Sequence, residues 1–449
     1  MLATLFTVLA VLPPTTPPWP PTYNMSLSTL TMAVNGSGWS SPERGAQFGI
    51  VSYDWSNDKA QWARATPMDC EERLLEQAQM TKARSGNASK VFVYRNLVKA
   101  LPWFTSVREK LLDPAYQGWF LRFRDGAAPA AGGHAPYAVP PCAAENASKC
   151  SGLYHDQGQT PEVPTAAQPH PDGSCGAVAD TGGCDCGAGL PCGEYLWDHR
   201  NGSMLREWLV REHIGGAAGL GSPAVDGMFV DDFWCSDVLC AAEPGTAGCP
   251  CNDPVQGPTE VDRYFQYDSG LSDDAIALLT LEWNRTMSAF QAAVLAAGAY
   301  TWSLIPGQEN ANANPDLLHA SSCAAAARAR CGAAAPTQSQ SWLFGLTVNG
   351  SAPAQLEQDV AFFLLARGPY AWLGWGVWGM GWPFNAEPAH GGLPPQPHGV
   401  PRPAALDTDY GEPAGHCEEA SKGVFRRAWT KADVELDCNT WKATIKMKE

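Results

Sequence analysis

The chain has 449 residues, of which 45% are hydrophobic, and a formal net charge of -16 with a pI near 5.0. Its length suits one large α/β barrel with insertions, or two domains. The acidic balance argues against nucleic acid or an anionic membrane as a partner, because either requires a basic face. A neutral polymer such as a polysaccharide is compatible with this surface.

The first residues predict passage through the secretory pathway. An apolar run from Leu2 to Leu12 has the length of a signal-peptide core, so residues 1–22 are interpreted as a signal peptide with a Pro-rich start. Residues 23–46 are rich in Pro, Ser, Thr and Gly and are interpreted as a linker. No later stretch is long and apolar enough to span a bilayer.

Fifteen cysteines and seven N-x-S/T sequons agree with a secreted or lumenal protein that carries disulfides. The sequons begin at Asn24, Asn35, Asn87, Asn146, Asn201, Asn284 and Asn349. Residues 124–193 read as a Cys-rich insertion whose pairings the sequence leaves open. A metal held by Cys184, Cys186 and Cys192 is the alternative there, although the spacing is not that of a zinc finger. Cys323 and Cys331 are expected to pair.

Residues 47–423 alternate strands and helices. Strands are predicted at 47–55, 90–96, 194–199, 225–230, 299–305, 341–348 and 371–380, and helices at 69–84, 106–112, 203–213, 272–297, 313–331 and 354–367. This order is typical of a parallel α/β fold, and residues 424–449 form a C-terminal β segment. A (β/α)₈ TIM barrel and an open doubly wound sheet both fit. The barrel is favoured, and no cofactor is expected, because no Gly-rich phosphate loop opens a helix.

Polar and aromatic residues gather where these strands end. In a parallel barrel the carboxyl ends of all strands meet on one face. A glycan cleft requires two carboxylates, groups that bind hydroxyls and aromatic platforms. The candidates for hydroxyl and ring binding are Asp54, Trp55, Tyr94, Arg95, Asn96, Asp198, His199 and Trp234, with Trp375 and Trp378 from a Gly-interleaved series that could equally pack in the core.

Four strand ends also carry a resemblance. GIVSYDWSN, KVFVYRN, YLWDHRN and VDGMFVDD resemble, in order, the first four strand ends of glycoside-hydrolase-type TIM barrels of uncharacterised specificity, whose fourth strand reads D-G-x-F-x-D-[DN]. The closing FRRAWTKADVELDCNTWKATI is similar to the β segment after those barrels. The resemblance spans about residues 46–447. It implies a TIM barrel in which Asp231, the last acid of the fourth-strand element, is the nucleophile.

The resulting prediction is a secreted glycoside hydrolase that acts on a poly- or oligosaccharide. Asp231 is the predicted nucleophile or base, Asp232 its support and Glu309 the general acid, because Glu309 directly follows a strand. Strand alternation would turn Asp231 and Asp232 to opposite faces unless the strand bulges. Two alternatives stay open: a non-catalytic carbohydrate-binding barrel, and a phosphodiesterase whose metal is held by Asp231, Asp232 and Asp198.

Overall fold

The computed structural model describes residues 16–33, 35–36, 38–122, 153, 155–156, 186–190, 194–232, 271–303, 318–349, 352–375 and 402–449. Several predictions fall outside these residues: the Leu2–Leu12 run, nearly all of the 124–193 insertion, the Cys-rich loop after the 225–230 strand, Trp234, Glu309 and Trp378. Within the described ranges, no helix combines the length and the apolar character that a membrane crossing needs.

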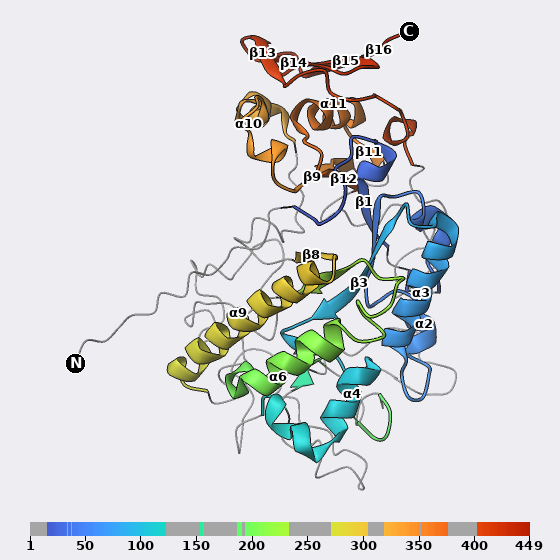
Figure 1. Cartoon of the computed structure of the whole chain (residues 1–449), viewed down its shortest axis with the longest axis vertical. Coiled ribbons are helices and arrows are strands. Elements are labelled where there is room, and N and C mark those ends of the chain that lie inside the picture. Colours follow the sequence, from blue (N-terminus) through green and yellow to red (C-terminus); the bar gives the residue numbers. More distant parts are fainter. Residues whose placement is uncertain are drawn as a thin grey trace, which may run out of the picture.

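A seven-stranded parallel sheet forms the centre of the molecule, in the order β8-β7-β3-β2-β1-β12-β9 (Figure 1). Its strands are β1 (Thr29–Ala33), β2 (Ile50–Tyr53), β3 (Lys90–Asn96), β7 (Gly227–Asp231), β8 (Tyr300–Ser303), β9 (Trp342–Leu346) and β12 (Ala371–Trp375). Strands β1, β2, β3, β7 and β8 follow one another across the sheet in chain order, and β12 and β9 continue it on the other side of β1. Within the described residues the sheet is therefore open between β8 and β9, and its strand order is that of a barrel rather than that of a doubly wound sheet. The α/β prediction is confirmed as a curled parallel sheet, to which the described residues contribute seven strands, and the closed barrel of eight stays a prediction.

Two predicted assignments within the sheet are wrong. The segment predicted as a linker contains β1, whose residues are all buried and which pairs with β2 and β12. The strand predicted at 194–199 is instead β6 (Glu194–Leu196), the centre of a small antiparallel sheet with β4 (Lys99–Ala100) and β5 (His155–Asp156). Tyr195, Leu196 and Trp197 form a short continuous apolar run, which is typical of a buried parallel strand and so did not reveal the antiparallel pairing.

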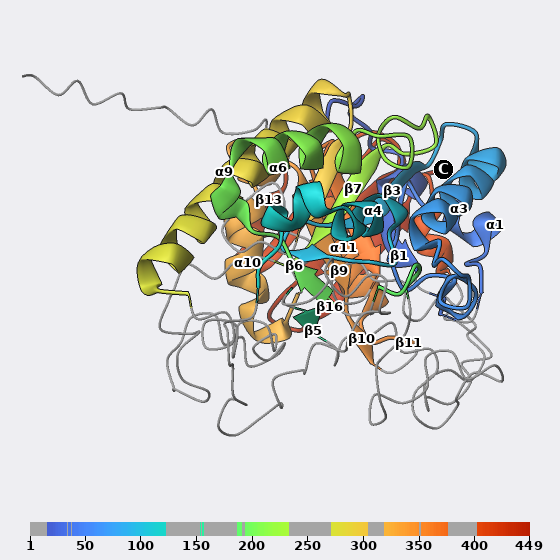
Figure 2. The same cartoon turned by 90° about the horizontal axis from the view of Figure 1, so that it is seen from below.

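Helices cover the outside of the curled sheet, as the view from below shows (Figure 2). The main ones are α3 (Cys70–Ser85), α4 (Thr105–Leu112), α6 (Ser203–Trp208), α9 (Asp273–Ala296), α10 (Cys323–Arg330) and α11 (Leu356–Ala366). Ser272 caps α9 by accepting from the backbone N–H of Ala275, as its sequence predicts. The side chains of β2 and β3 that point outward contact this layer of helices. Tyr53 binds Thr81 of α3 at 2.6 Å, and Arg95 binds Glu71 of α3 at 3.3 Å.

Trp19 packs against the opposite, concave face near the amino ends of the strands. Its ring makes edge contacts, with centroids 6.0–6.4 Å apart, to Phe92, Tyr300 and Trp372 from three strands. Its indole N–H donates to the carbonyl of Gly298 at 3.2 Å. The two edges of the sheet approach each other here, because the hydroxyls of Tyr300 and Ser341 lie 2.7 Å apart, one in β8 and the other directly before β9.

Gly227 begins β7 at a crowded point of this concave face. A Cβ at this position would lie 2.4 Å from the carbonyl oxygen of Tyr300 and 2.5 Å from the ring of Phe92. Only glycine therefore allows β7 to start between its two neighbours at this spacing.

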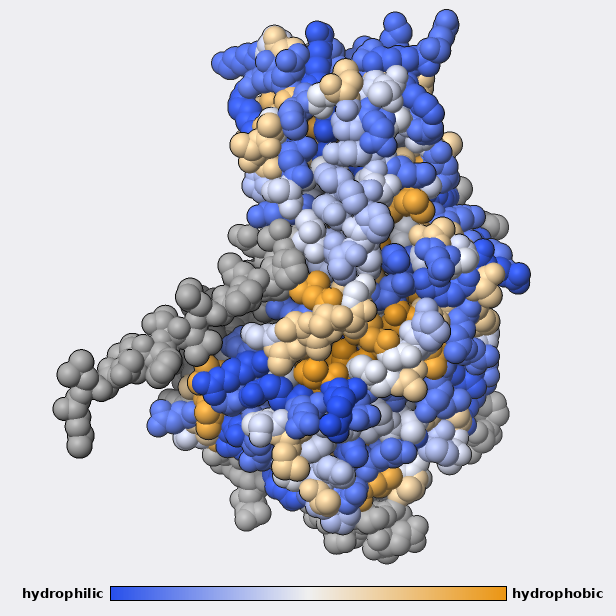
Figure 3. Space-filling model, viewed as in Figure 1, coloured by the Kyte–Doolittle hydropathy of each residue, from blue (hydrophilic) through white to orange (hydrophobic). Residues whose placement is uncertain are grey.

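The C-terminal β segment is a four-stranded antiparallel sheet of β13 (Glu418–Ser421), β14 (Val424–Ala428), β15 (Ala432–Asp437) and β16 (Lys442–Met447). This sheet packs on α11. The guanidinium of Arg427 in β14 donates to the carbonyls of Leu364, Leu365 and Arg367 at the end of that helix. Its outer surface is mostly hydrophilic (Figure 3).

Two disulfides attach α10 to this sheet. They join Cys323 to Cys438 and Cys331 to Cys417, so the predicted Cys323–Cys331 pair is wrong. Cys323 and Cys331 stand at opposite ends of α10, eight residues apart, and the helix between them holds them too far apart to bond to each other.

Candidate functional site

The carboxyl ends of β3 and β7 hold the candidate site. These strands are neighbours in register, with Tyr94 beside Phe229 and Asn96 beside Asp231. Because strand residues alternate, these four side chains share one face, and Arg95 points to the helices. Tyr94 and Asn96 are buried, with 2% and 1% of their surface exposed, so their polar atoms require partners within the protein.

Three hydrogen bonds connect Asp231 to Asp232 through Tyr94 and Asn96. The hydroxyl of Tyr94 donates to Asp231 Oδ2 at 3.0 Å and accepts from Asn96 Nδ2 at 3.0 Å. The same Nδ2 donates to Asp232 Oδ2 at 2.7 Å. Asp232 has a φ of 60°, in the left-handed region that Asp tolerates better than most residues. This turn breaks strand alternation, so Asp231 reaches Tyr94 and Asp232 reaches Asn96 without the bulge that the sequence prediction required.

Lys99 and Glu194 complete the cluster, and the sequence prediction missed both. Lys99 Nζ lies 3.1 Å from Asp232 Oδ2 and 2.7 Å from Glu194 Oε2. Their side chains are 11% and 6% exposed. Lys99 comes three residues after Asn96, so a search just beyond the strand end would have found it. Glu194 offered no such signal, because it stands at the beginning of a strand rather than at its end.

The electrostatic environment of Asp231 favours the protonated form of this acid. The pKa of Asp231 is raised to about 8, first by burial and then by the charge of Asp232, while the ammonium of Lys99 opposes both. Burial alone would lower the pKa of Lys99, but Asp232 and Glu194 outweigh it and the pKa lies well above its usual value. Burial also raises the pKa of Tyr94, as do Asp231 and Asp232. The site thus contains a neutral acid beside a firmly charged ammonium at neutral pH.

Asp54, at the end of β2, belongs to the same neighbourhood. Its charge acts on both Asp231 and Tyr94. Burial raises its own pKa, although the backbone N–H of Ser56 donates to its Oδ1 at 2.9 Å. The structure therefore brings Asp54, Tyr94, Asn96, Asp231 and Asp232 of the predicted set together.

Two other predicted residues, Arg95 and Asp198, are engaged elsewhere. Arg95 donates to Glu71 and to the carbonyls of His213 and Ala218, which fixes the helix layer to the back of β3. Asp198 binds Arg200 through both carboxylate oxygens, at 2.8 Å each. These side chains support the fold rather than the acid pair.

His199 and Trp55 are also packing residues. The ring nitrogens of His199 meet the carbonyl of Leu97 at 2.7 Å and the hydroxyl of Thr286 at 3.3 Å, and burial lowers its pKa to about 4. The Trp55 ring packs with Trp62 and Trp103. Asp198 and His199 were predicted at a barrel strand end, and this was wrong because β6 belongs to the small antiparallel sheet.

The tryptophan series is only partly described. Trp372 is 5% exposed and contacts Trp19, so it packs in the core. Trp375 is the last residue of β12, at the carboxyl edge of the sheet. Its position in the backbone agrees with a place near the site, and its role as a platform stays a prediction.

The described residues contain no group of three or more His, Cys, Asp or Glu arranged to hold a metal ion. In particular, Asp198 does not join Asp231 and Asp232, because Arg200 occupies its carboxylate. The trio predicted as phosphodiesterase ligands is therefore not assembled among these residues.

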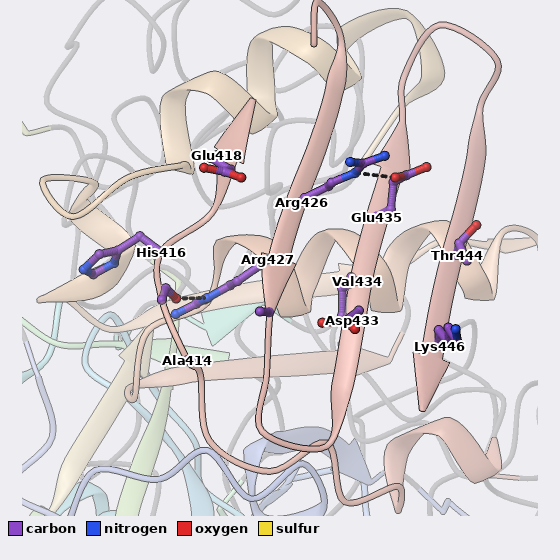
Figure 4. Close-up of a pocket in the computed structure, with 12 residues that line it drawn as sticks. Ala414, His416, Glu418, Arg426, Arg427, Asp433, Val434, Glu435, Thr444 and Lys446 are labelled. Atoms are coloured by element: carbon purple, nitrogen blue, oxygen red, sulfur yellow. Dashed lines mark hydrogen bonds and ion pairs between the residues drawn. The ribbon is translucent and has the colours of Figure 1, made fainter. Parts of the chain in front are cut away.

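A hollow of about 590 Å³ lies on the C-terminal sheet (Figure 4), and neither Asp231 nor Asp232 lines it. Side chains in cross-strand register line it: Glu418 beside Arg426, Arg426 beside Glu435, and Glu435 beside Thr444. Arg426 is paired with Glu435 at 2.5 Å. Such opposite-charge neighbours stabilise an exposed antiparallel sheet, which accounts for this row of side chains.

Fold and site together define a parallel α/β protein of the barrel type with paired acids at the carboxyl edge of its sheet. No protein-family model matches the chain, and no curated protein matches it. The debranching enzyme of Nostoc punctiforme is similar in structure at 10% sequence identity and a TM-score of 0.39, over 94% of this chain and 88% of that one. The trehalulose synthase from Pseudomonas mesoacidophila is similar at 11% identity and a TM-score of 0.35, over 79% of this chain and 66% of that one, slightly less than two thirds of its length. The class stated above rests on strand order and side-chain geometry, not on these scores.

Proposed function

We propose that the chain is a glycoside hydrolase that acts on a poly- or oligosaccharide through Asp231 and Asp232. The observation that carries the proposal is the series of three hydrogen bonds that joins these acids through Tyr94 and Asn96. Bonds of 3.0, 3.0 and 2.7 Å keep the two carboxylate oxygens within roughly 9 Å of each other, so their separation does not exceed the largest one found in glycosidase acid pairs.

The charges of the site support a division of roles that reverses the sequence expectation. A carboxyl group with a pKa near 8 is protonated at neutral pH and suits proton donation to a leaving oxygen. Asp232, beside the Lys99 ammonium, suits the role of base or nucleophile. Glu309 follows β8 in sequence and remains a second candidate for the acid. Trp234, Trp375 and Trp378 remain the proposed platforms for sugar rings.

We also propose that the protein acts outside the cell or in the secretory lumen. Two disulfides, Cys323–Cys438 and Cys331–Cys417, support an oxidising compartment. The sequon at Asn87 supports it as well, because Asn87 is exposed in the turn after α3, where a glycan would meet solvent.

The test is hydrolysis of a panel of neutral glycans by the wild type, Asp231→Asn and Asp232→Asn. Each variant is expected to lose about 10²–10⁴-fold in kcat/KM, since each loses one half of the acid pair. Asp226→Asn is the matched control: Asp226 precedes the same strand at its other end, where it pairs with Lys82, so its loss lowers stability and leaves turnover intact.

The outcomes separate the alternatives. Glycan binding without hydrolysis by the wild type would identify a carbohydrate-binding barrel and refute the hydrolase. Phosphodiester cleavage that EDTA abolishes would favour the metal-dependent alternative.

A further inference from the structure

Lys99 occupies a position that the proposed reaction does not by itself require. Its ammonium is nearly buried and lies between two carboxylates from different parts of the chain, Asp232 after β7 and Glu194 in β6. Burial of a lysine ammonium costs free energy unless opposite charges lie beside it. We therefore expect Asp232 and Glu194 to be placed to pair with Lys99.

The local backbone is arranged to deliver the ammonium. Asn96 Oδ1 accepts from the backbone N–H groups of Val98 and Lys99, at 2.8 and 2.7 Å, and so folds the chain back at the end of β3. β4 then pairs with β6, with Lys99 beside Leu196. Because Asn96 also donates to Asp232, one amide sets the positions of both the cation and the acid that it contacts.

We propose that Lys99, held by Glu194, is a positioning residue that keeps Asp232 as the carboxylate and leaves Asp231 as the protonated acid. This inference rests on the proposed function for its meaning in catalysis, but the charge assignment holds for the folded protein with or without substrate.

The groups around Asp231 agree with this arrangement. Asp232 from its own strand end and Asp54 from the end of β2 both raise the pKa of Asp231, and Lys99 from β4 lowers it. Tyr94 from β3 donates a hydrogen bond to Asp231. The ammonium directly contacts Asp232 at 3.1 Å, so its attraction for negative charge acts at short range on this carboxylate. Two adjacent acids in a shielded site do not both ionise readily, so the proton remains on Asp231.

Three variants test the proposal through the pH profile of kcat/KM. Lys99→Met keeps the length of the side chain and removes the charge, so the acid limb, which reports the base, is expected to move up by about one pH unit or more. Glu194→Gln removes the carboxylate that competes with Asp232 for the Lys99 ammonium, so the acid limb is expected to move to lower pH. Lys99→Arg keeps the charge and is expected to restore the wild-type limb.

Opposite shifts in Lys99→Met and Glu194→Gln would support the positioning role. Lower thermal stability in both variants with unmoved limbs would mean that Lys99 is structural only and would overturn the proposal. If Lys99→Met does not fold, the direction of the Glu194→Gln shift decides, because that variant is isosteric.

A second readout does not depend on activity. Carboxyl ¹³C NMR titration of aspartate-labelled protein, assigned with Asp231→Asn and Asp232→Asn, is expected to show one protonated and one ionised group near pH 6. In Lys99→Met the two signals are expected to titrate together as a coupled pair. An ionised Asp231 at pH 6 in the wild type would refute the charge assignment. The expected titration in a protein without glycosidase activity would instead refute only the proposed function.

Discussion

The side-chain amide of Asn96 donates to Asp232 at 2.7 Å across the boundary between β3 and the end of β7. The side-chain oxygen of Asn96 accepts from the backbone N–H groups of Val98 and Lys99, where the chain turns back after β3. Asn96 is therefore the residue on which the geometry of the acid pair depends most directly.

Asn96→Ala removes bonds to Asp232, to Tyr94 and to two backbone N–H groups. At about 1 kcal/mol for each net hydrogen bond, the free energy of unfolding is expected to fall by about 2–4 kcal/mol, with a loss of turnover as the acids separate. Urea unfolding and kcat measure the two effects. Asn87→Ala is the control, since Asn87 is exposed and its loss should change stability by less than about 0.5 kcal/mol. Equal effects of the two substitutions would contradict the role given to Asn96.

Asp231 is expected to make stability depend on pH. Its folded-state pKa of about 8 exceeds the usual 3.8, so between these values the folded protein holds a proton that the unfolded chain has released. The contribution of this group to stability is therefore full at low pH and falls as pH rises towards 8, by at most about 1.4 kcal/mol per pH unit.

Asp231→Asn cannot take part in this titration. Urea unfolding at several values between pH 5 and 8 should show the wild type losing stability relative to the variant as pH rises. Parallel curves would mean that Asp231 is ionised in the folded protein.

The hydroxyl contact between Tyr300 and Ser341 is expected to link the two edges of the sheet. Tyr300→Phe and Ser341→Ala should each cost about 0.5–1.5 kcal/mol, because each removes one partner of the same bond. The double variant should cost less than the sum of the two. Strict additivity in this double-mutant cycle would show that the residues do not interact.

The disulfide pattern predicts two crosslinked peptides in non-reducing mass spectrometry, one with Cys323 and Cys438 and the other with Cys331 and Cys417. Replacing Cys323 and Cys438 together by Ala should lower stability by about 2–4 kcal/mol, because a long loop is released. Cys70 is buried and free, so Cys70→Ala serves as a control that leaves both crosslinks in place. A peptide that joins Cys323 to Cys331 would contradict the structure.

The parts of the fold that the sequence predicts well are those with a strong local pattern. KVFVYRN gave the bounds of β3 because a continuous apolar run ending in polar residues is typical of a buried parallel strand. β1 was missed because TLTMA is short and lies among Pro, Ser and Gly residues, and only its pairing with β2 and β12 makes it a strand.

The residues of the candidate site also fall into those that a local sequence pattern reveals and those that only tertiary contacts reveal. Tyr94, Asn96, Asp231 and Asp232 were found because each stands at the end of a strand. Lys99 and Glu194 meet only through the antiparallel pairing of β4 with β6, which no local pattern encodes. The left-handed backbone of Asp232 was also beyond prediction, since it depends on the contacts that Asn96 and Lys99 make after folding.

The place of β1 between β2 and β12 has a consequence for how the chain is made. A ribosome releases β1 early, but its partner in the register Leu30 with Gly374 emerges only when most of the chain has been synthesised. Until then β1 presents an unpaired edge made of residues that are all buried in the folded protein, the kind of surface that promotes aggregation. Completion of the sheet must therefore be a late step, and we expect nascent chains that stop before residue 371 to depend on chaperones.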